Sequence, residues 1–192
     1  MELDSAPRLS LCRREDSALL IVDVQTRLTG AMPAETRAAV LRNAGILIDA
    51  ARALGIPILH TEQYPRGLGH TEQVLAERLA GAAQRLEKTA FSCCGAEGFD
   101  AAACADGRTQ WILCGMEAHV CVLQTALELH ARGLEVFVVE DGVCSRTESN
   151  RGNALARLRQ AGVIVTNTES VLFEWLRDAA DPQFKALSAL IR

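Results

Sequence analysis

One stretch decides the fold: WILCGMEAHVCV, residues 111–122. Its apolar beginning is typical of a buried strand, glycine 115 interrupts the run, and a helical pattern follows from Leu123 to Arg132. A strand that passes through a glycine turn into a helix is the repeating unit of a parallel α/β sheet. This arrangement puts Cys121 near a helix N-terminus, where unpaired backbone N–H groups and the helix dipole favour a thiolate over a thiol.

The rest of the chain repeats this alternation of strand and helix. Apolar runs predict strands at residues 17–23, 56–60, 85–88, 111–114, 134–139 and 163–165. Helical spacing predicts helices at residues 34–54, 71–79, 99–105, 123–132, 150–161, 170–177 and 182–190, with loops at 25–33 and 61–70. We therefore expect an α/β fold, a three-layer α/β/α sandwich around a six-stranded, mostly parallel, Rossmann-like sheet. With no repeat or linker, residues 1–192 are expected to form a single domain, with the polar residues 1–17 as an arm across it.

Composition argues against several classes of protein. The 192 residues are 49% hydrophobic and 23% charged, as in soluble globular proteins, and the net charge of −4 argues against a nucleic-acid surface. No apolar run approaches the ~20 residues of a membrane helix, and the acidic start lacks the features of a signal peptide. We therefore expect a cytoplasmic protein without membrane contact. Seven cysteines without paired spacing argue against a disulfide framework, and four are interpreted as small core residues: Cys12, Cys104, Cys114 and Cys144.

Three chemically complementary residues follow predicted strands. Asp23 ends the first strand, Lys88 ends the third, and Cys121 lies just past the fourth. The carboxyl ends of parallel strands share one edge of a sheet, where α/β proteins place their sites. Taken singly, each residue has an ordinary interpretation: a capping aspartate, a surface lysine paired with Glu87, or a buried structural cysteine. Together they form the base, cation and nucleophile of a cysteine hydrolase.

Four blocks of the sequence resemble the isochorismatase-like hydrolase superfamily, which includes nicotinamidases and N-carbamoylsarcosine amidohydrolase. They are residues 18–25 (ALLIVDVQ), 87–92 (EKTAFS), 115–126 (GMEAHVCVLQTA) and 138–146 (VVEDGVCSR). The resemblance spans nearly the whole chain and implies the three-layer α/β/α fold. The family generally forms dimers or larger assemblies, so we also expect a homo-oligomer.

The same resemblance implies a catalytic triad of Asp23, Lys88 and Cys121. Asp23 would take the thiol proton and pass it to the leaving amine, while Lys88 would stabilise the thiolate and help to orient the substrate. Cys121 would attack a carbonyl carbon to form a thioester, which water then hydrolyses. The family's non-proline cis peptide falls at Met116–Glu117, and the backbone N–H groups of Glu117 and Cys121 are the oxyanion candidates.

Departures from the family pattern argue against some of the activities found in the family. Ala118 stands where the family usually has threonine. Metal-dependent nicotinamidases carry an Asp-x-His-x-x-x-His run after the second strand, and His60 and His70 do not restore that spacing. We therefore predict no metal and no cofactor, and disfavour nicotinamidase. Isochorismatase proper lacks the cysteine, so Cys121 disfavours that activity also. The run Thr61–Pro65 resembles an uncharacterised branch of the family, which leaves the small-molecule substrate open.

Pocket residues are predicted from loops that leave the strand ends near the triad: Gln25, Leu28, Gln63, Tyr64, Phe91 and His119. Leu28 and Phe91 have core packing as the favoured alternative, and His119 can equally be a helix-cap residue. A redox role for the adjacent Cys93 and Cys94 is disfavoured, because neighbouring cysteines seldom form a relaxed disulfide.

We expect a hydrolase of small amides or related carbonyl compounds. Two other classes of function are the alternatives. A catalytically idle binding or scaffold protein is the first, motivated by Ala118. The second, a nucleotide-binding Rossmann domain, fails because no glycine-rich G-x-G-x-x-G or P-loop motif follows the first strand.

Overall fold

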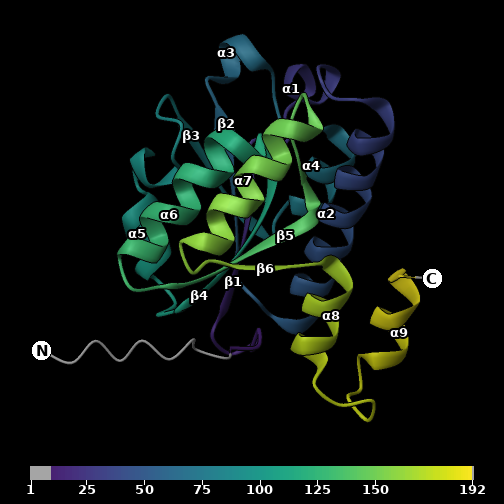
Figure 1. Ribbon diagram of the computed structural model, residues 1–192. Coiled ribbons are helices and arrows are strands. Elements are labelled where there is room, and N and C mark those ends of the chain that lie inside the picture. The colour runs from purple at the N-terminus through teal and green to yellow at the C-terminus, as the bar shows by residue number, and fades with distance from the viewer. Residues whose placement is uncertain (1–9, 192) are drawn as a thin grey trace, which may run out of the picture.

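The computed structural model describes residues 10–191, in which six strands form a single sheet (Figure 1). All pairings between its neighbouring strands are parallel. The strands are β1 (Ser17–Val22), β2 (Ile58–Gln63), β3 (Ala83–Lys88), β4 (Gln110–Met116), β5 (Glu135–Cys144) and β6 (Ile164–Thr166). The predicted α/β fold with a parallel sheet is confirmed.

Helices connect the strands and cover both faces of the sheet. The α-helices are α1 (Thr26–Gly30), α2 (Ala34–Leu54), α3 (Pro65–Leu68), α4 (Gln73–Leu79), α5 (Phe99–Cys104), α6 (Leu123–Ala131), α7 (Glu148–Gln160), α8 (Thr168–Leu176) and α9 (Phe184–Ser188). Three short helical turns complete them: η1 (Cys93–Gly95), the π-helical turn η2 (Ala118–Val122) and η3 (Ala189–Ile191).

The strand order is β3-β2-β1-β4-β5-β6. The chain builds outward from β1 to β3 on one side and from β4 to β6 on the other, so the order reverses between β1 and β4. Crevices at the carboxyl ends of strands on either side of such a reversal are the usual binding sites of open α/β sheets. Asp23 follows β1 and Cys121 follows β4, so both residues lie at this point of the fold.

Two buried clusters separate the three layers. One lies between the sheet and helices α2, α4, α8 and α9, and the other between the sheet and helices α5, α6 and α7. Alternate residues of β1 show the division, because Leu19 and Ile21 face the first cluster while Leu20 and Val22 face the second. A strand buried on both faces reads as a continuous apolar run, which is why β1 could be found from sequence. Across residues 10–191, no helix combines the length and apolar character needed to cross a bilayer.

Several predicted boundaries were wrong. Helices α1 and α3 occupy segments predicted as loops, because one or two turns are too short for a hydrophobic period to register. Strand β5 was predicted to end at residue 139 but continues to Cys144. A register shift between Leu113 and Gly115 realigns β4 with the later part of β5, so the polar residues 140–142 stay within the strand. Cys104 is also exposed rather than part of the core, whereas Cys12, Cys114 and Cys144 are buried as expected.

Candidate active site

Asp23 is held at the end of β1 by main-chain and side-chain contacts. Its backbone lies in the left-handed region at a φ of 50°, and its N–H donates to the carbonyl oxygen of Thr61 over 3.2 Å. The Thr61 hydroxyl in turn donates to Asp23 Oδ1 over 2.7 Å. The side chain of Asp23 is completely buried. A buried carboxylate needs such partners, because an unpaired charge is costly to remove from water.

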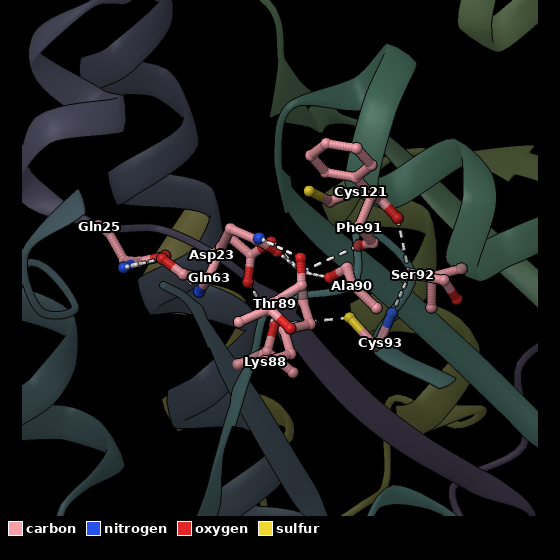
Figure 2. A network of polar contacts seen from close by, with 12 residues as sticks. Asp23, Gln25, Gln63, Lys88, Thr89, Ala90, Phe91, Ser92, Cys93 and Cys121 are labelled. Carbon is pink, nitrogen blue, oxygen red and sulfur yellow. Dashed lines mark hydrogen bonds and ion pairs between the residues drawn. The ribbon is translucent and has the colours of Figure 1, made fainter. Parts of the chain in front are cut away.

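Lys88 provides the opposite charge from the end of β3. Its Nζ donates to Asp23 Oδ2 and to Gln63 Oε1, each over 2.7 Å, and to the carbonyl oxygens of Ala90 and Phe91 over 3.2 and 2.9 Å (Figure 2). An ammonium group has only three N–H bonds, so these four acceptors occupy all of them. Through these contacts Lys88 holds the Asp23 carboxylate and the backbone of residues 90–91 in place. The predicted substrate-orienting role of Lys88 remains a prediction.

Cys121 lies in η2, which leads directly into α6, and only 5% of its surface is exposed. Its pKa is raised above the ordinary thiol value, first by burial and then by the charge of the Asp23 carboxylate, whereas Lys88 opposes the shift. This direction is opposite to the one that a helix start favours. Desolvation outweighs the helix dipole. The raised pKa favours a resting thiol beside the Asp23 carboxylate.

Gly115 allows β4 to approach the end of β1 closely. It adopts a φ of +127°, and a Cβ atom there would lie 2.0 Å from the carbonyl oxygen of Val22. The following Met116–Glu117 peptide is cis, at the bond where the sequence places it. The Glu117 carboxylate accepts hydrogen bonds from the backbone N–H and Nε of Arg146 over 3.0 and 3.2 Å. These contacts fasten the loop that leads from β4 to Cys121.

Gln25 and Gln63 were predicted as pocket residues, and the structure places both beside the triad. Gln25 Nε2 donates to the carbonyl oxygens of Gln63 and Gly69 over 3.0 and 2.6 Å, while its Oε1 accepts from the Gln63 N–H over 2.7 Å. Gln63 Oε1 accepts from Lys88, and Gln63 Nε2 donates to the Thr89 carbonyl oxygen over 2.7 Å. Both amides are thus engaged with the protein and support Lys88 rather than presenting free groups.

The other four predicted pocket residues differ in their surroundings. Leu28 packs against the first core cluster, which matches its alternative interpretation. His119 Nδ1 lies 3.0 Å from the Ser145 hydroxyl, so its ring is held against the loop after β5. Tyr64 and Phe91 are 54% and 56% exposed, so core packing is wrong for Phe91. Tyr64 and Lys88 also line a cavity of about 440 Å³ together with residues that include Arg66, Glu87 and Glu97.

Sequence reasoning missed three residues that support the site: Thr61, Cys93 and Thr125. The Thr125 hydroxyl donates to the Cys121 carbonyl oxygen over 2.7 Å and accepts from the Cys93 N–H over 2.9 Å. The sulfur of Cys93 lies 3.5 Å from the Thr61 hydroxyl. Thr125 falls inside a block that carries the family resemblance, which was the available signal. Thr61 begins the run Thr61–Pro65 that resembles one branch of the family, but threonine is also an ordinary strand residue, so its contact with Asp23 could not be predicted.

The His, Cys, Asp and Glu side chains were compared with the arrangement that a metal ion needs, and they do not match it in the described part of the chain. Among residues 10–191, no group of three or more His, Cys, Asp and Glu side chains is arranged to hold a metal ion. Of the two histidines considered from sequence, His70 Nδ1 lies 3.1 Å from Glu62 Oε2, whereas His60 is nearly buried. The absence of a catalytic metal or other cofactor stays a prediction.

Comparison with known proteins identifies the family of this fold and site. The family model described as the isochorismatase domain matches residues 17–170. Isochorismatase domain-containing protein 2A of Mus musculus is 38% identical over 193 aligned positions, which cover 98% of this chain and 89% of the mouse protein. The chain therefore belongs to the isochorismatase family, and this membership supports a hydrolase function.

Solved structures share the same architecture. The MAR1 ribonuclease of Caenorhabditis elegans is 38% identical with a TM-score of 0.88, covering 95% of this chain and 92% of that one. YcaC of Pseudomonas aeruginosa, solved with hexane-2,5-diol and covalent acrylamide, is 27% identical with a TM-score of 0.89 over 95% and 91% of the two chains. YcaC of Escherichia coli, described as an octameric hydrolase of unknown specificity, is 26% identical with a TM-score of 0.87 over 97% and 91%.

Proposed function

We propose that this protein is a cysteine-dependent hydrolase of a small amide or related carbonyl compound, acting through a thioester on Cys121. One observation carries the proposal: Cys121 lies near enough to the buried Asp23 carboxylate for that charge to add to burial in raising the pKa of its thiol, and Lys88 holds the same carboxylate in an ion pair at 2.7 Å. A nucleophile beside a base that a third group orients is the arrangement that activates a weak nucleophile.

The proposed reaction begins with transfer of the thiol proton from Cys121 to Asp23 as the sulfur attacks the carbonyl carbon. The carbonyl oxygen becomes an oxyanion, for which the backbone N–H groups of Glu117 and Cys121 are the proposed donors. Asp23 then gives its proton to the leaving amine, the C–N bond breaks, and an acyl thioester remains. Water attacks the thioester while Asp23 accepts a proton from it, and release of the carboxylic acid returns the proton to the sulfur.

The raised pKa of Cys121 fits this sequence of steps. A thiol that stays protonated in the resting state needs a base at the moment of attack, and Asp23 is the carboxylate whose charge acts on it. Lys88 supports Asp23 in both of its protonation states, because its other acceptors hold the ammonium in place. The covalent acrylamide of the related P. aeruginosa YcaC structure adds support for a reactive group in this fold.

The test offers the protein a panel of small primary amides and N-carbamoyl compounds and measures their hydrolysis by the release of ammonia. Hydroxylamine added during turnover would capture the thioester as a hydroxamate, and mass spectrometry of the quenched protein would locate the acyl group. We expect both signals to disappear in Cys121→Ala and to persist in Cys104→Ala, which alters an exposed cysteine outside the site. Turnover that survives Cys121→Ala would disprove the nucleophile. Absence of turnover with every compound would favour the idle scaffold.

RNA hydrolysis is the second candidate, because the related C. elegans protein is called a ribonuclease. The net charge of −4 favours the small-molecule proposal, since phosphate-rich partners are usually met by basic surfaces. The same preparations should therefore be incubated with single-stranded RNA oligonucleotides. Cleavage by the parent protein that is lost in Cys121→Ala would replace the amide proposal with the ribonuclease one.

We further propose that the protein works as a homo-oligomer, a dimer or larger. Support comes from the octameric state named for the related E. coli YcaC. Light scattering coupled to size-exclusion chromatography measures the mass directly, and a monomer at micromolar concentration would disprove this part of the proposal.

A further inference from the structure

The two oxygens of the Asp23 carboxylate have different partners. Oδ2 accepts a hydrogen bond from the Lys88 ammonium and Oδ1 accepts one from the Thr61 hydroxyl, each over 2.7 Å. Thr61 lies in β2 next to the end of β1, and its carbonyl oxygen also accepts from the Asp23 N–H over 3.2 Å. Thr61 therefore holds both the side chain and the main chain of Asp23, and it does so with neutral groups rather than a charge.

A buried thiol also contacts the Thr61 hydroxyl. Cys93 has no exposed surface, and its sulfur lies 3.5 Å from the hydroxyl oxygen of Thr61. A hydroxyl group carries one hydrogen, and that of Thr61 is donated to Asp23, so in the contact with Cys93 the oxygen accepts and the S–H donates. Burial, and after it the charge of Asp23, raises the pKa of Cys93 to about 12, so the sulfur keeps its hydrogen at neutral pH. The result is an ordered chain in which Cys93 donates to Thr61 and Thr61 donates to Asp23.

The main chain of Cys93 is connected to the proposed nucleophile. Its N–H donates to the Thr125 hydroxyl over 2.9 Å, and that hydroxyl donates to the Cys121 carbonyl oxygen over 2.7 Å. The preceding residue fastens the turn η1 to helix α6, because the Ser92 hydroxyl donates to Glu128 Oε2 over 2.8 Å. Cys93 thus has its side chain joined to the support of the proposed base and its main chain joined to the support of the proposed nucleophile.

We propose that Thr61 and Cys93 are positioning residues for the reaction, which keep the Asp23 carboxylate ionised and fixed in orientation until it accepts the thiol proton. Hydrogen bonds donated to a carboxylate favour its charged form. A donor that itself accepts a hydrogen bond is polarised and donates more strongly, so Cys93 acts on Asp23 through Thr61. The inference rests on the proposed hydrolase function, in which Asp23 is the proton acceptor.

Two pairs of variants separate hydrogen bonding from packing. Thr61→Val and Cys93→Ala remove the donors, whereas Thr61→Ser and Cys93→Ser keep an O–H group in each place. Without its donor the Asp23 carboxylate takes up a proton more readily, so activity with a hydrolysed amide should fall to half at a higher pH on the acid side. We expect a rise of about one pH unit in Thr61→Val, the size of one lost hydrogen bond to a charged group, and a smaller rise in Cys93→Ala. Both serine variants should stay near the parent profile. Two further titratable groups beside Asp23, Lys88 of β3 and Cys121 of η2, are present in all four variants.

Infrared spectroscopy tests the chain without any substrate. The absorption band of an S–H group moves to lower frequency when the group donates a hydrogen bond. Subtracting the spectrum of Cys93→Ala from that of the parent isolates the Cys93 band, and the same subtraction is made in the Thr61→Val background. We expect the band at a higher frequency when Thr61 is valine. Cys12→Ala, which removes another fully buried thiol in a different part of the core, is the control and should keep the parent pH profile.

Three results would overturn the inference. An S–H band of Cys93 that is the same in the parent and in Thr61→Val would show that the thiol does not donate to Thr61. A pH profile unchanged in both Thr61→Val and Cys93→Ala, in a protein whose turnover requires Cys121, would reduce both residues to packing and leave the proposed hydrolase intact. Absence of any turnover that requires Cys121 would remove the hydrolase mechanism and this inference with it. If Thr61→Val does not fold, Cys93→Ala and Cys93→Ser provide the same kinetic comparison.

Discussion

Lys88 Nζ lies 2.7 Å from Asp23 Oδ2 although strand β2 separates the two strands that lead to these residues. The lysine therefore reaches across the end of β2, where Gln63 provides a second acceptor at 2.7 Å. Neither charged side chain has any exposed surface. The pair thus joins three adjacent strand ends at the point where the proposed nucleophile meets its base.

The first prediction concerns this ion pair. Lys88→Met leaves the Asp23 carboxylate buried without its counter-ion, so the free energy of unfolding should fall by about 3–5 kcal/mol. Urea denaturation at pH 7 would measure the loss. Lys185→Met is the matched control, since Lys185 is the only other lysine and lies exposed in α9. In Asp23→Asn/Lys88→Met, much of the lost stability should return because no isolated charge remains. Equal destabilisation by the double and single variants would contradict this explanation.

The members of the proposed triad could be located in the sequence because strand ends are visible there. Asp23 and Cys121 follow continuous apolar runs, and parallel strands bring their carboxyl ends to one edge. The weak apolar pattern of β3, in which only Leu86 and Lys88 are buried, made Lys88 harder to place without the family resemblance. The sheet and its two helical layers followed from the same alternation of strand and helix.

The sequence could not show which hydrogen-bond partners the polar side chains would have. Gln25 and Gln63 were predicted as pocket residues, and the structure adds that they bind each other and that Gln63 binds Lys88. The protonation state of Cys121 was missed for a similar reason. A position near a helix start is a local property, whereas burial and the neighbouring Asp23 depend on the assembled fold.

The second prediction tests the close approach of β4 to β1. Gly115→Ala places a Cβ atom 2.0 Å from the Val22 carbonyl oxygen at a φ of +127°, so backbone must move. We expect a loss of at least about 2 kcal/mol in the free energy of unfolding, together with loss of activity. Gly152→Ala is the control, because a Cβ atom there meets nothing within 4 Å and alanine favours the interior of α7 by about 1 kcal/mol. Equal stability of the two variants would contradict the steric argument.

The third prediction concerns Glu62, which fastens the segment after β2. Burial alone would raise its pKa, but hydrogen bonds from the Thr71 backbone, His70 and the Thr71 hydroxyl, together with the charge of Arg85, lower it below the ordinary value. A carboxyl whose pKa is lower in the folded state stabilises the protein above its unfolded pKa of about 4.5. That stabilisation is lost as the pH falls from there through the folded pKa.

Urea denaturation between pH 7 and pH 3 measures this dependence. Glu62→Gln should be less stable than the parent protein at pH 7, and the difference should shrink as the pH falls below about 4.5, the ordinary pKa of the group. Glu77→Gln, at an exposed position of α4, should follow the parent curve. A difference between Glu62→Gln and the parent that stays constant across this range would show that proton binding at Glu62 is not linked to folding.

The last prediction separates two proposed effects of Asp23 on Cys121: it raises the pKa of the resting thiol, and it accepts the thiol proton during attack. The Asp23 charge raises the pKa of Cys121, while Lys88 lowers it. Asp23→Asn removes the first influence and keeps the second, so its thiol should ionise at a lower pH than in the parent protein. Alkylation of Cys121 by iodoacetamide should then begin at lower pH in Asp23→Asn, even though amide hydrolysis is lost with the base.

Mass spectrometry of tryptic peptides would follow alkylation across pH 6 to 10. The exposed Cys104 provides an internal reference in the same samples, and its profile should be the same in both proteins. Opposite changes in alkylation and turnover would assign Asp23 the role of proton acceptor, since a residue that merely favours the thiolate would lower both when removed. If Cys121 alkylation instead shifts to higher pH in Asp23→Asn, then Asp23 promotes ionisation of the resting thiol. The proposed order of proton transfer and attack would then be wrong.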